Sequence, residues 1–219
     1  MSGGGGLSDS PTGGTGAGLR PYLKRKKSSF GDTKIAVLGH EGTGKSALSV
    51  RFLTKRFIGE YDQTIESKYK YTTVVDTESI TFEILDTISN REDCGARDDV
   101  LRWGDGFMLV YSVVSRKSFD ALQEVKRKIE DAKKGSPAPI LMVGNKCDLA
   151  HMRQVTKDEG EKLALEFGCT FVEVSASEDV SQVTEAFHAL CREVIEFKRR
   201  SRTFLDRVFG AFGREKASS

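Results

Sequence analysis

Residues 34–46, KIAVLGHEGTGKS, carry the strongest structural signal in the chain. Their first five residues form an almost unbroken apolar run, which is typical of a buried strand in a parallel sheet. The next eight, Gly39 to Ser46, match the pattern G-x-x-x-x-G-K-[ST], and residues 46–56 repeat apolar side chains at helical spacing. This order of strand, glycine-rich loop and helix predicts a loop whose backbone N–H groups bind phosphate, assisted by the positive end of the helix.

The loop also supplies candidate ligands. We expect Lys45 to reach the β- and γ-phosphates of a nucleoside triphosphate, and the Ser46 hydroxyl to bind Mg²⁺. With the neighbouring backbone, the predicted phosphate site contains Glu41, Gly42, Thr43, Gly44, Lys45, Ser46 and Ala47. A chance glycine turn before a helix is the alternative, and the preceding strand argues against it.

Strands and helices alternate along the rest of the chain. Capping residues Thr156 and Glu159 mark the start of one helix. Apolar runs predict strands at residues 69–75, 80–85, 107–113, 140–143 and 171–174, and helical spacing predicts helices at residues 119–134, 157–167 and 180–198. The alternation predicts an α/β fold: a three-layer P-loop NTPase domain with a six-stranded, mostly parallel sheet that contains one hairpin.

Charge and composition divide the chain into three parts. Residues 1–31 are rich in Gly and Ser and then basic, which predicts a disordered tail; residues 32–198 form the domain; residues 199–219 form a basic amphipathic tail. Residues 1–30 carry five basic groups and one acid, and residues 198–219 carry seven and two, so the net charge of +2 leaves −7 between them. An acidic domain argues against a broad nucleic-acid-binding face.

Composition also argues against a membrane-spanning protein, a secreted protein and a metal site built from Cys and His. The sequence has no apolar run of about 18 residues and no signal-peptide pattern, so neither a transmembrane helix nor secretion is expected. The four cysteines and three histidines have no metal-ligand spacing, which favours reduced thiols in an intracellular protein. We further expect the protein to be cytoplasmic and monomeric.

Two later motifs indicate which base the nucleotide carries. Asn145-Lys146-Cys147-Asp148 follows the strand at residues 140–143, and Ser175-Ala176-Ser177 follows the strand at residues 171–174. Ligands of open α/β sheets bind at such strand ends. The Asp148 carboxylate can accept hydrogen bonds from the two N–H donors of guanine, which adenine lacks. Asn145 would brace the loops, Lys146 would cover the base, and the Ala176 N–H, with Ser175 beside it, could donate to guanine O6.

In this order the motifs resemble those of Ras-type small GTPases over about residues 33–198. Residues 61–66, YDQTIE, are similar to the Ras effector segment, and Asp86-Thr87 stands where the family's D-T-A-G motif begins. Residues 51–57 and Trp103-Gly104 are most similar to a divergent branch that includes the Ras-related, oestrogen-regulated growth inhibitor. The resemblance implies a Ras-like G domain that binds GTP and GDP with Mg²⁺, hydrolyses GTP and acts as a signalling switch.

The resemblance also implies roles for single residues. Thr64 would bind Mg²⁺ through its hydroxyl and the γ-phosphate through its N–H, and Asp86 would hold Mg²⁺ through water. Phe57 would pack against the guanine ring, with an ordinary core aromatic as the alternative. Residues Tyr61–Tyr71, which include an expected edge strand, would bind an effector protein. The sequence names neither the effector nor an exchange factor or activating protein.

Four positions depart from the Ras pattern. Glu41 stands where Ras has Gly, close to the expected γ-phosphate, where like charges repel. Asn90 replaces the water-positioning Gln and is one methylene shorter. Ile88 and Ser89 replace Ala-Gly, and Ser has less conformational freedom than Gly. With Asn90, Thr64 and Lys45 as catalytic residues, we expect weak GTP hydrolysis and a poor response to Ras activating proteins.

Alternative interpretations stay open at this point. The same departures fit a nucleotide-binding scaffold without meaningful turnover, and Glu41 could instead point to solvent and have little effect. A P-loop kinase fits less well, because the sequence has no arginine-rich lid and N-K-x-D would have no purpose there.

The C-terminal tail suggests a contact of its own. The last cysteine is Cys191 and the chain ends KASS, so prenylation at a C-a-a-X box is not expected. On a helix, one face would carry Phe204, Leu205, Val208, Phe209 and Phe212, and the other Arg200, Arg207 and Arg214. Residues 198–216 therefore fit an interfacial helix on an anionic membrane or a calmodulin-type target. A helical extension docked on the domain, a solvated tail and a nuclear localisation signal are the alternatives.

Overall fold

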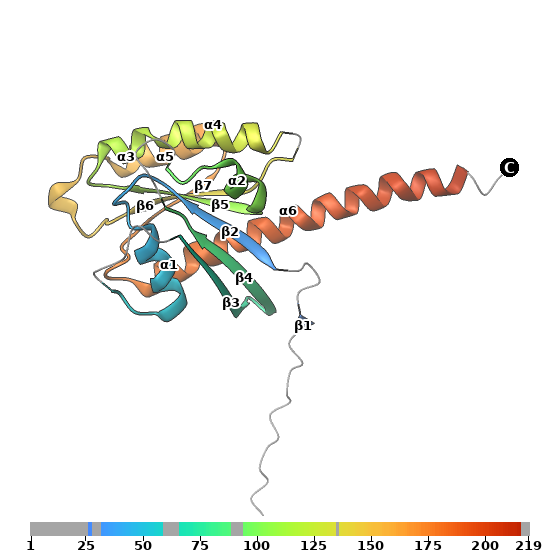
Figure 1. The fold of residues 1–219 in the computed structure, drawn as a ribbon, viewed down its shortest axis with the longest axis horizontal. Coiled ribbons are helices and arrows are strands. Elements are labelled where there is room, and N and C mark those ends of the chain that lie inside the picture. The colour runs from blue at the N-terminus through green and yellow to red at the C-terminus, as the bar shows by residue number, and fades with distance from the viewer. Residues whose placement is uncertain (1–25, 28–31, 59–65, 89–93, 135, 216–219) are drawn as a thin grey trace, which may run out of the picture.

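The computed structural model of the chain describes residues 26–27, 32–58, 66–88, 94–134 and 136–215, and the side chains among residues 32–203 of these (Figure 1). The strands are β1 (Lys26–Lys27), β2 (Thr33–Leu38), β3 (Ser67–Val75), β4 (Glu78–Asp86), β5 (Gly106–Ser112), β6 (Ile140–Asn145) and β7 (Thr170–Val174). The helices are α1 (Lys45–Thr54), α2 (Asp98–Trp103), α3 (Arg116–Asp120), α4 (Leu122–Ala132), the 3₁₀ turn η1 (Ala150–Met152), α5 (Lys157–Phe167) and α6 (Val180–Glu215).

All seven strands form one sheet. Its order is β1-β4-β2-β5-β6-β7, and β3 pairs with β4. The β3–β4 hairpin is antiparallel and every other pairing is parallel. The predicted mostly parallel sheet of six strands with one hairpin is therefore confirmed. The two-residue β1 is an addition, formed by Lys26 and Lys27 within the segment expected to be disordered.

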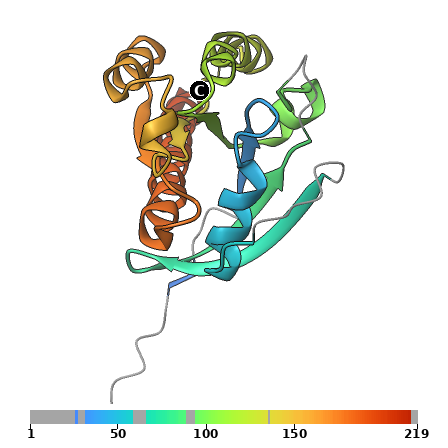
Figure 2. The ribbon, with the colours of Figure 1, turned by 90° about the vertical axis from the view of Figure 1, so that its left-hand side faces the viewer.

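The sheet separates two hydrophobic cores. Ile35 and Val37 of β2 face the core that contains α1 and α6, whereas Ala36 and Leu38 face the core that contains α2, α4 and α5. This alternation follows from the two-residue period of a strand, which points successive side chains to opposite faces. Figure 2 shows the helices on the two sides of the curved sheet. The predicted three layers are confirmed.

The capping box predicted for α5 is present. The Thr156 hydroxyl accepts a hydrogen bond from the Glu159 N–H at 3.2 Å, and Glu159 Oε2 accepts one from the Thr156 N–H at 2.8 Å. The hydrogen bond from the Thr156 backbone, followed by one from Arg116, lowers the pKa of Glu159 to about 2.

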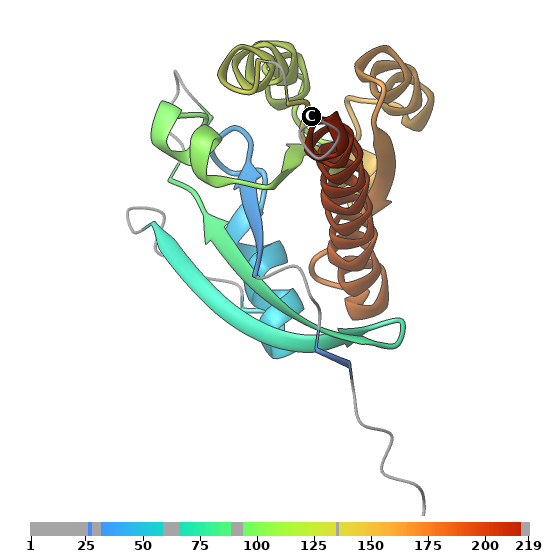
Figure 3. The same ribbon diagram turned by 90° about the vertical axis from the view of Figure 1, so that its right-hand side faces the viewer.

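Helix boundaries differ from the prediction in two places. The helix expected over residues 119–134 is divided at Ala121 into α3 and α4. The helix expected to end at Lys198 continues to Glu215, across the boundary placed before residue 199. Figure 1 shows its C-terminal part extending beyond the sheet, and Figure 3 views it almost end-on. None of the helices in the described part of the chain is long and apolar enough to cross a membrane.

Candidate functional site

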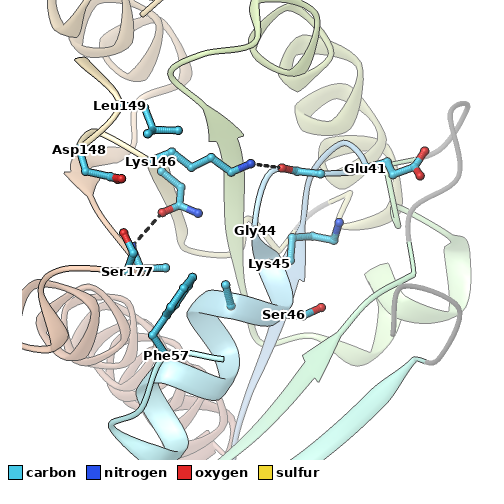
Figure 4. A pocket seen from close by; sticks show the side chains of 13 residues that line it. Glu41, Gly44, Lys45, Ser46, Phe57, Lys146, Asp148, Leu149 and Ser177 are labelled. Carbon is cyan, nitrogen blue, oxygen red and sulfur yellow. Dashed lines mark hydrogen bonds between the residues drawn. The ribbon is translucent and has the colours of Figure 1, made fainter. Parts of the chain in front are cut away.

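A cavity of about 400 Å³ lies at the carboxyl ends of the parallel strands, next to the start of α1 (Figure 4). Three loops surround it: the glycine-rich loop after β2, the loop after β6 and the loop after β7. Its lining residues are Glu41, Gly42, Gly44, Lys45, Ser46, Ala47, Phe57, Asn145, Lys146, Asp148, Leu149, Ala176 and Ser177. The fold thus brings the glycine-rich loop together with two motifs that lie about 100 and 130 residues further along the chain.

The glycine-rich loop presents the N-terminus of α1 to this cavity. Gly44 is the N-cap residue, with a left-handed backbone (φ 93°), and no side chain caps the helix. The first N–H groups of a helix have no partner inside it, so they are available to an anion in front of them. A Cβ on Gly44 would lie only 2.3 Å from Asn145 Nδ2, and glycine avoids this clash because it has no Cβ.

Lys45 lies under the loop and Thr43 helps to shape it. Lys45 is 7% exposed, and its amine donates to the His40 carbonyl at 3.3 Å. The Thr43 hydroxyl donates to the same carbonyl at 2.9 Å, and Thr43 is fully buried. Thr43 therefore does not line the cavity, and its side chain holds the loop.

Asp86 and Ser46 form the part of the site that suits a cation. Asp86 ends β4 with 3% exposure, and its Oδ1 atom is buried without a hydrogen-bond partner. Burial raises the pKa of Asp86, while hydrogen bonding with Ser46 and the charge of Lys45 act in the opposite direction. No group of three or more His, Cys, Asp and Glu side chains among the described residues could hold a metal. A hard cation here would therefore take oxygen atoms from Asp86, Ser46, water and the ligand itself, which is the pattern that Mg²⁺ prefers.

Asn145 joins the loops on the other side of the cavity. It is 1% exposed; its Nδ2 donates to the Thr43 carbonyl at 2.8 Å, and its Oδ1 accepts from the Ala176 N–H at 3.2 Å. Lys146 adds a second link, because its amine donates to the Gly42 carbonyl at 2.7 Å (Figure 4). This is the bracing geometry expected for Asn145. The Ala176 N–H expected for guanine O6 is bonded to Asn145 instead, so it would have to share or exchange that partner.

The remaining side chains define the rim. Asp148 and Phe57 both line the cavity, and Phe57 is 45% exposed, so its alternative interpretation as a core aromatic is wrong. Ser175 is buried and does not line the cavity; its hydroxyl accepts from the Glu178 N–H at 3.2 Å.

Glu41 lies at the far end of the loop from the base motif. Its side chain is exposed, and Figure 4 shows its carboxylate pointing away from Lys146 and Asp148. Glu41 is thus on the same side of the cavity as Lys45 and Ser46, the end at which phosphates are expected.

Several predicted residues lie outside the described residues: Thr64, Ser89, Asn90 and the first part of Tyr61–Tyr71. The described part of that segment begins at Glu66, which pairs with Arg97 at 2.9 Å, and continues into β3. In the part of the chain that the structure describes, β3 pairs only with β4, so its other edge is open.

Leu149 and Ser177 were not predicted but line the cavity. Leu149 directly follows the Asn145–Asp148 motif and Ser177 ends the Ser175–Ser177 motif, and this proximity was the only available signal in the sequence.

Comparisons with known proteins find relatives over most of the chain. The model of the Ras family matches residues 34–196. The chain is 49% identical to the Ras-related and estrogen-regulated growth inhibitor of Bos taurus over 163 residues, which is 74% of this chain and 81% of that protein. The human protein of the same name is 48% identical over the same shares. A Ras-like protein of Laccaria bicolor is 41% identical over 166 residues, 76% of this chain and 79% of its own length.

Proposed function

Because this chain belongs to the Ras family of small GTPases, we propose that it is a Mg²⁺-dependent GTP/GDP switch whose own GTP hydrolysis is slow. Membership of the family implies guanine-nucleotide binding and GTPase activity in general. The observation that supports nucleotide binding most strongly is the brace from Asn145, which ties the phosphate loop to the base loop through two hydrogen bonds. One ligand that reaches from the α1 N-terminus to Asp148 would contact both loops.

Three parts of the cavity would each recognise one part of the nucleotide. The α1 N-terminus and Lys45 would bind the phosphates, and Phe57 would cover the base. Asp148 would accept both guanine N–H groups, which is the basis for rejecting adenine. Competition between labelled GDP and unlabelled GTP, GDP or ATP tests this arrangement, and equal competition by ATP would overturn it.

Ser46 and Asp86 fit Mg²⁺ because both offer oxygen atoms and the Asp86 Oδ1 atom has no hydrogen-bond partner. Thr64, the third expected ligand, lies outside the described residues. When bound, Mg²⁺ would neutralise part of the phosphate charge. Removal of Mg²⁺ with EDTA should therefore speed GDP release, and Asp86→Ala should make the release rate insensitive to EDTA.

Slow hydrolysis is proposed from Glu41 and Asn90. Glu41 adds negative charge at the phosphate end of the cavity, and Asn90 is too short to act as the family's Gln does. Single-turnover hydrolysis of bound GTP should be no faster than the intrinsic rate of Ras, which is on the order of 10⁻⁴ per second.

Substitutions at Glu41 separate its charge from its size. Glu41→Gly should raise the rate by up to about tenfold, because relief of roughly 1.4 kcal/mol of repulsion corresponds to that factor. Glu41→Gln keeps the size and removes the charge, so a rate close to that of the Gly variant identifies charge as the cause. An unchanged rate in both variants would mean that Glu41 only meets solvent.

A nucleotide-binding scaffold without meaningful turnover is the second candidate, and the same departures favour it. The two candidates differ in the nucleotide that co-purifies with the protein and in whether nucleotide exchange changes the binding of partner proteins. A switch releases phosphate measurably and changes its binding to an effector on exchange of GDP for GTP. A scaffold shows neither. We further propose the open edge of β3 as the effector surface, and a cytoplasmic location for the protein.

A further inference from the structure

Two long basic side chains at α1 reach across to the segment that begins α6. The Arg51 guanidinium donates to the Glu178 carbonyl at 3.3 Å, and the Lys55 amine donates to the Thr184 hydroxyl at 3.1 Å. The partners are 127 and 129 positions apart in the sequence. The apolar faces of α1 and α6 lie in one hydrophobic core, on the same side of the sheet. We call these four residues the α1–α6 clamp.

The clamp joins the two chain segments that form the base end of the nucleotide cavity. Phe57 lines the cavity two residues after Lys55, and Ser177 lines it one residue before Glu178. Both lie at the end of the cavity away from Glu41 (Figure 4). Neither basic residue of the clamp lines the cavity itself. Any effect of the clamp on a bound base would therefore pass through these two neighbours.

Lys55 adopts a backbone conformation that is unfavourable for a lysine. It is the C-cap residue of α1, with φ 62° in the left-handed region, and its N–H donates to the Arg51 carbonyl at 2.9 Å. Helices commonly end with glycine in this conformation, because a Cβ is strained there. α1 begins at the cavity and runs away from it, so the turn at Lys55 returns the chain to the cavity at Phe57. A strained residue at such a turn points to a use for its side chain.

The Lys55 side chain is held against the domain. Its amine lies 4.7 Å from the centroid of the Phe52 ring, within the range at which an aromatic face attracts a cation. Phe52 is fully buried and stacks on Phe187 of α6, with the ring centroids 4.4 Å apart. Burial lowers the pKa of the Lys55 amine. The contacts with Thr184 and Phe52 therefore fix where the amine lies, and with it the turn that follows α1.

We propose that Lys55 and Arg51 are positioning residues for nucleotide retention: the α1–α6 clamp holds Phe57 and Ser177 at the guanine base and slows GDP release. This inference rests on the proposed nucleotide binding and assigns its regulation at the base end to contacts outside the cavity. A turn that only had to stabilise the fold would not need a strained Lys55, since glycine would make the same turn with less strain.

The experiment measures the release of a fluorescent GDP analogue from the Mg²⁺-loaded full chain, together with urea unfolding of the nucleotide-free protein. Lys55→Gly removes both the amine and the backbone strain. Release should become about fivefold faster, the factor that corresponds to one hydrogen bond, whereas the free energy of unfolding should be unchanged or higher. Lys55→Met keeps the strain and the apolar stem, so release should be as fast as in the Gly variant, without a gain in stability.

The other members of the clamp provide companion variants. Thr184→Val removes the acceptor and should match Lys55→Met, and the two changes together should add little, because they break the same bond. Arg51→Met should speed release by a similar factor and should add to Lys55→Met, because its partner is a different residue. The matched control is Arg56→Gln, which removes one exposed charge next to Phe57 and no clamp contact. Its release rate should stay within about twofold of the wild type.

Two readouts distinguish positioning from a general loosening of the domain. In a Phe57→Ala background, Lys55→Met should have little further effect on release, because the clamp acts through that ring. The affinity for inorganic pyrophosphate, which has no base, should be the same in Lys55→Met and in the wild type.

Three results would overturn the clamp. The first is GDP release from Lys55→Gly at the wild-type rate. The second is a loss of pyrophosphate affinity as large as the loss of GDP retention. The third is an effect of Arg56→Gln as large as that of Lys55→Met, since charge alone would then be responsible. A wild-type chain that retains no GDP would reject the proposed switch and the clamp with it, whereas normal retention in the wild type and in every variant rejects the clamp alone.

Discussion

Replacing Gly44 with Ala should destabilise the domain far more than replacing Gly42 with Ala. Both glycines have a left-handed backbone, with φ of 93° and 75°, so an Ala side chain is strained at either position. Their surroundings differ, however. A Cβ on Gly44 would lie 2.3 Å from Asn145 Nδ2, whereas a Cβ on Gly42 would meet nothing within 4 Å. The pair of variants therefore separates backbone strain from displacement of Asn145.

The expected difference follows from the bonds that Asn145 makes. Left-handed strain costs an L-residue about 1–2 kcal/mol, and both variants share this cost. Displacement of Asn145 also breaks its bonds to the Thr43 carbonyl and the Ala176 N–H, which are buried groups. Each bond contributes roughly 1 kcal/mol, and an unsatisfied buried partner costs somewhat more. Gly44→Ala should thus lower the free energy of unfolding by about 2–3 kcal/mol more than Gly42→Ala.

Urea unfolding of the nucleotide-free protein measures this difference. Trp103 is the only tryptophan of the chain, and its fluorescence reports on the transition. Asn145→Ala in the Gly44→Ala background should then cause little further loss, since the same bonds are already broken. Equal free energies of unfolding for the two glycine variants, within about 0.5 kcal/mol, would refute the reasoning, because Asn145 would then accommodate the methyl group without losing its bonds.

Three further perturbations test other parts of the structure. Asp148→Asn should weaken GDP binding at least about tenfold, because a charge-assisted hydrogen bond to the base is lost, and should leave competition by ATP unchanged. Equilibrium competition measures the affinities for GDP and ATP. An unchanged affinity for GDP would contradict the role of the carboxylate. Phe187→Ala should lower the free energy of unfolding in urea by about 3–5 kcal/mol, because the fully buried ring stacks on Phe52 with the ring centroids 4.4 Å apart. A loss below about 1 kcal/mol would show that the surrounding core fills the cavity left by the ring. Burial lowers the pKa of His188 below its ordinary value of 6.5, and its Nε2 has no hydrogen-bond partner. The unfolded chain therefore binds the proton more tightly, so the free energy of unfolding should fall as the pH drops from 7 through 6.5. His188→Gln should reduce this dependence on pH, and the control His151→Gln should retain it.

The sequence determined the nucleotide-binding part of the fold because the signals there are local. The strand, loop and helix of residues 34–56 lie next to one another, and each is specified by its own apolar period or glycines. The N-K-x-D and S-A-S segments were placed at strand ends by the apolar runs before them, so their meeting at one edge of the sheet followed from parallel topology. The capping box at Thr156 and Glu159 involves only four consecutive residues.

Very short elements and elements that depend on distant contacts were missed. α2 has six residues and η1 three, too short for a helical period to be seen. β1 has two residues and exists only because Glu78 and Ser79 of β4 offer backbone partners. The continuation of α6 beyond Lys198 is accompanied by contacts to Asp105 and Glu78, residues from two other parts of the chain.

The same distinction applies to the site. The sequence by itself selected the residue types, and with them the chemistry of phosphate, Mg²⁺ and a guanine base, because those follow from which groups donate and accept. Only the tertiary structure decided how the groups are used: that the Ala176 N–H bonds to Asn145, that Phe57 is half exposed, and that both basic termini start beside Glu78. The reason is physical. Residue identity fixes what bonds a group can make, whereas burial and pairing depend on neighbours that the chain supplies from about 30 to 120 positions away.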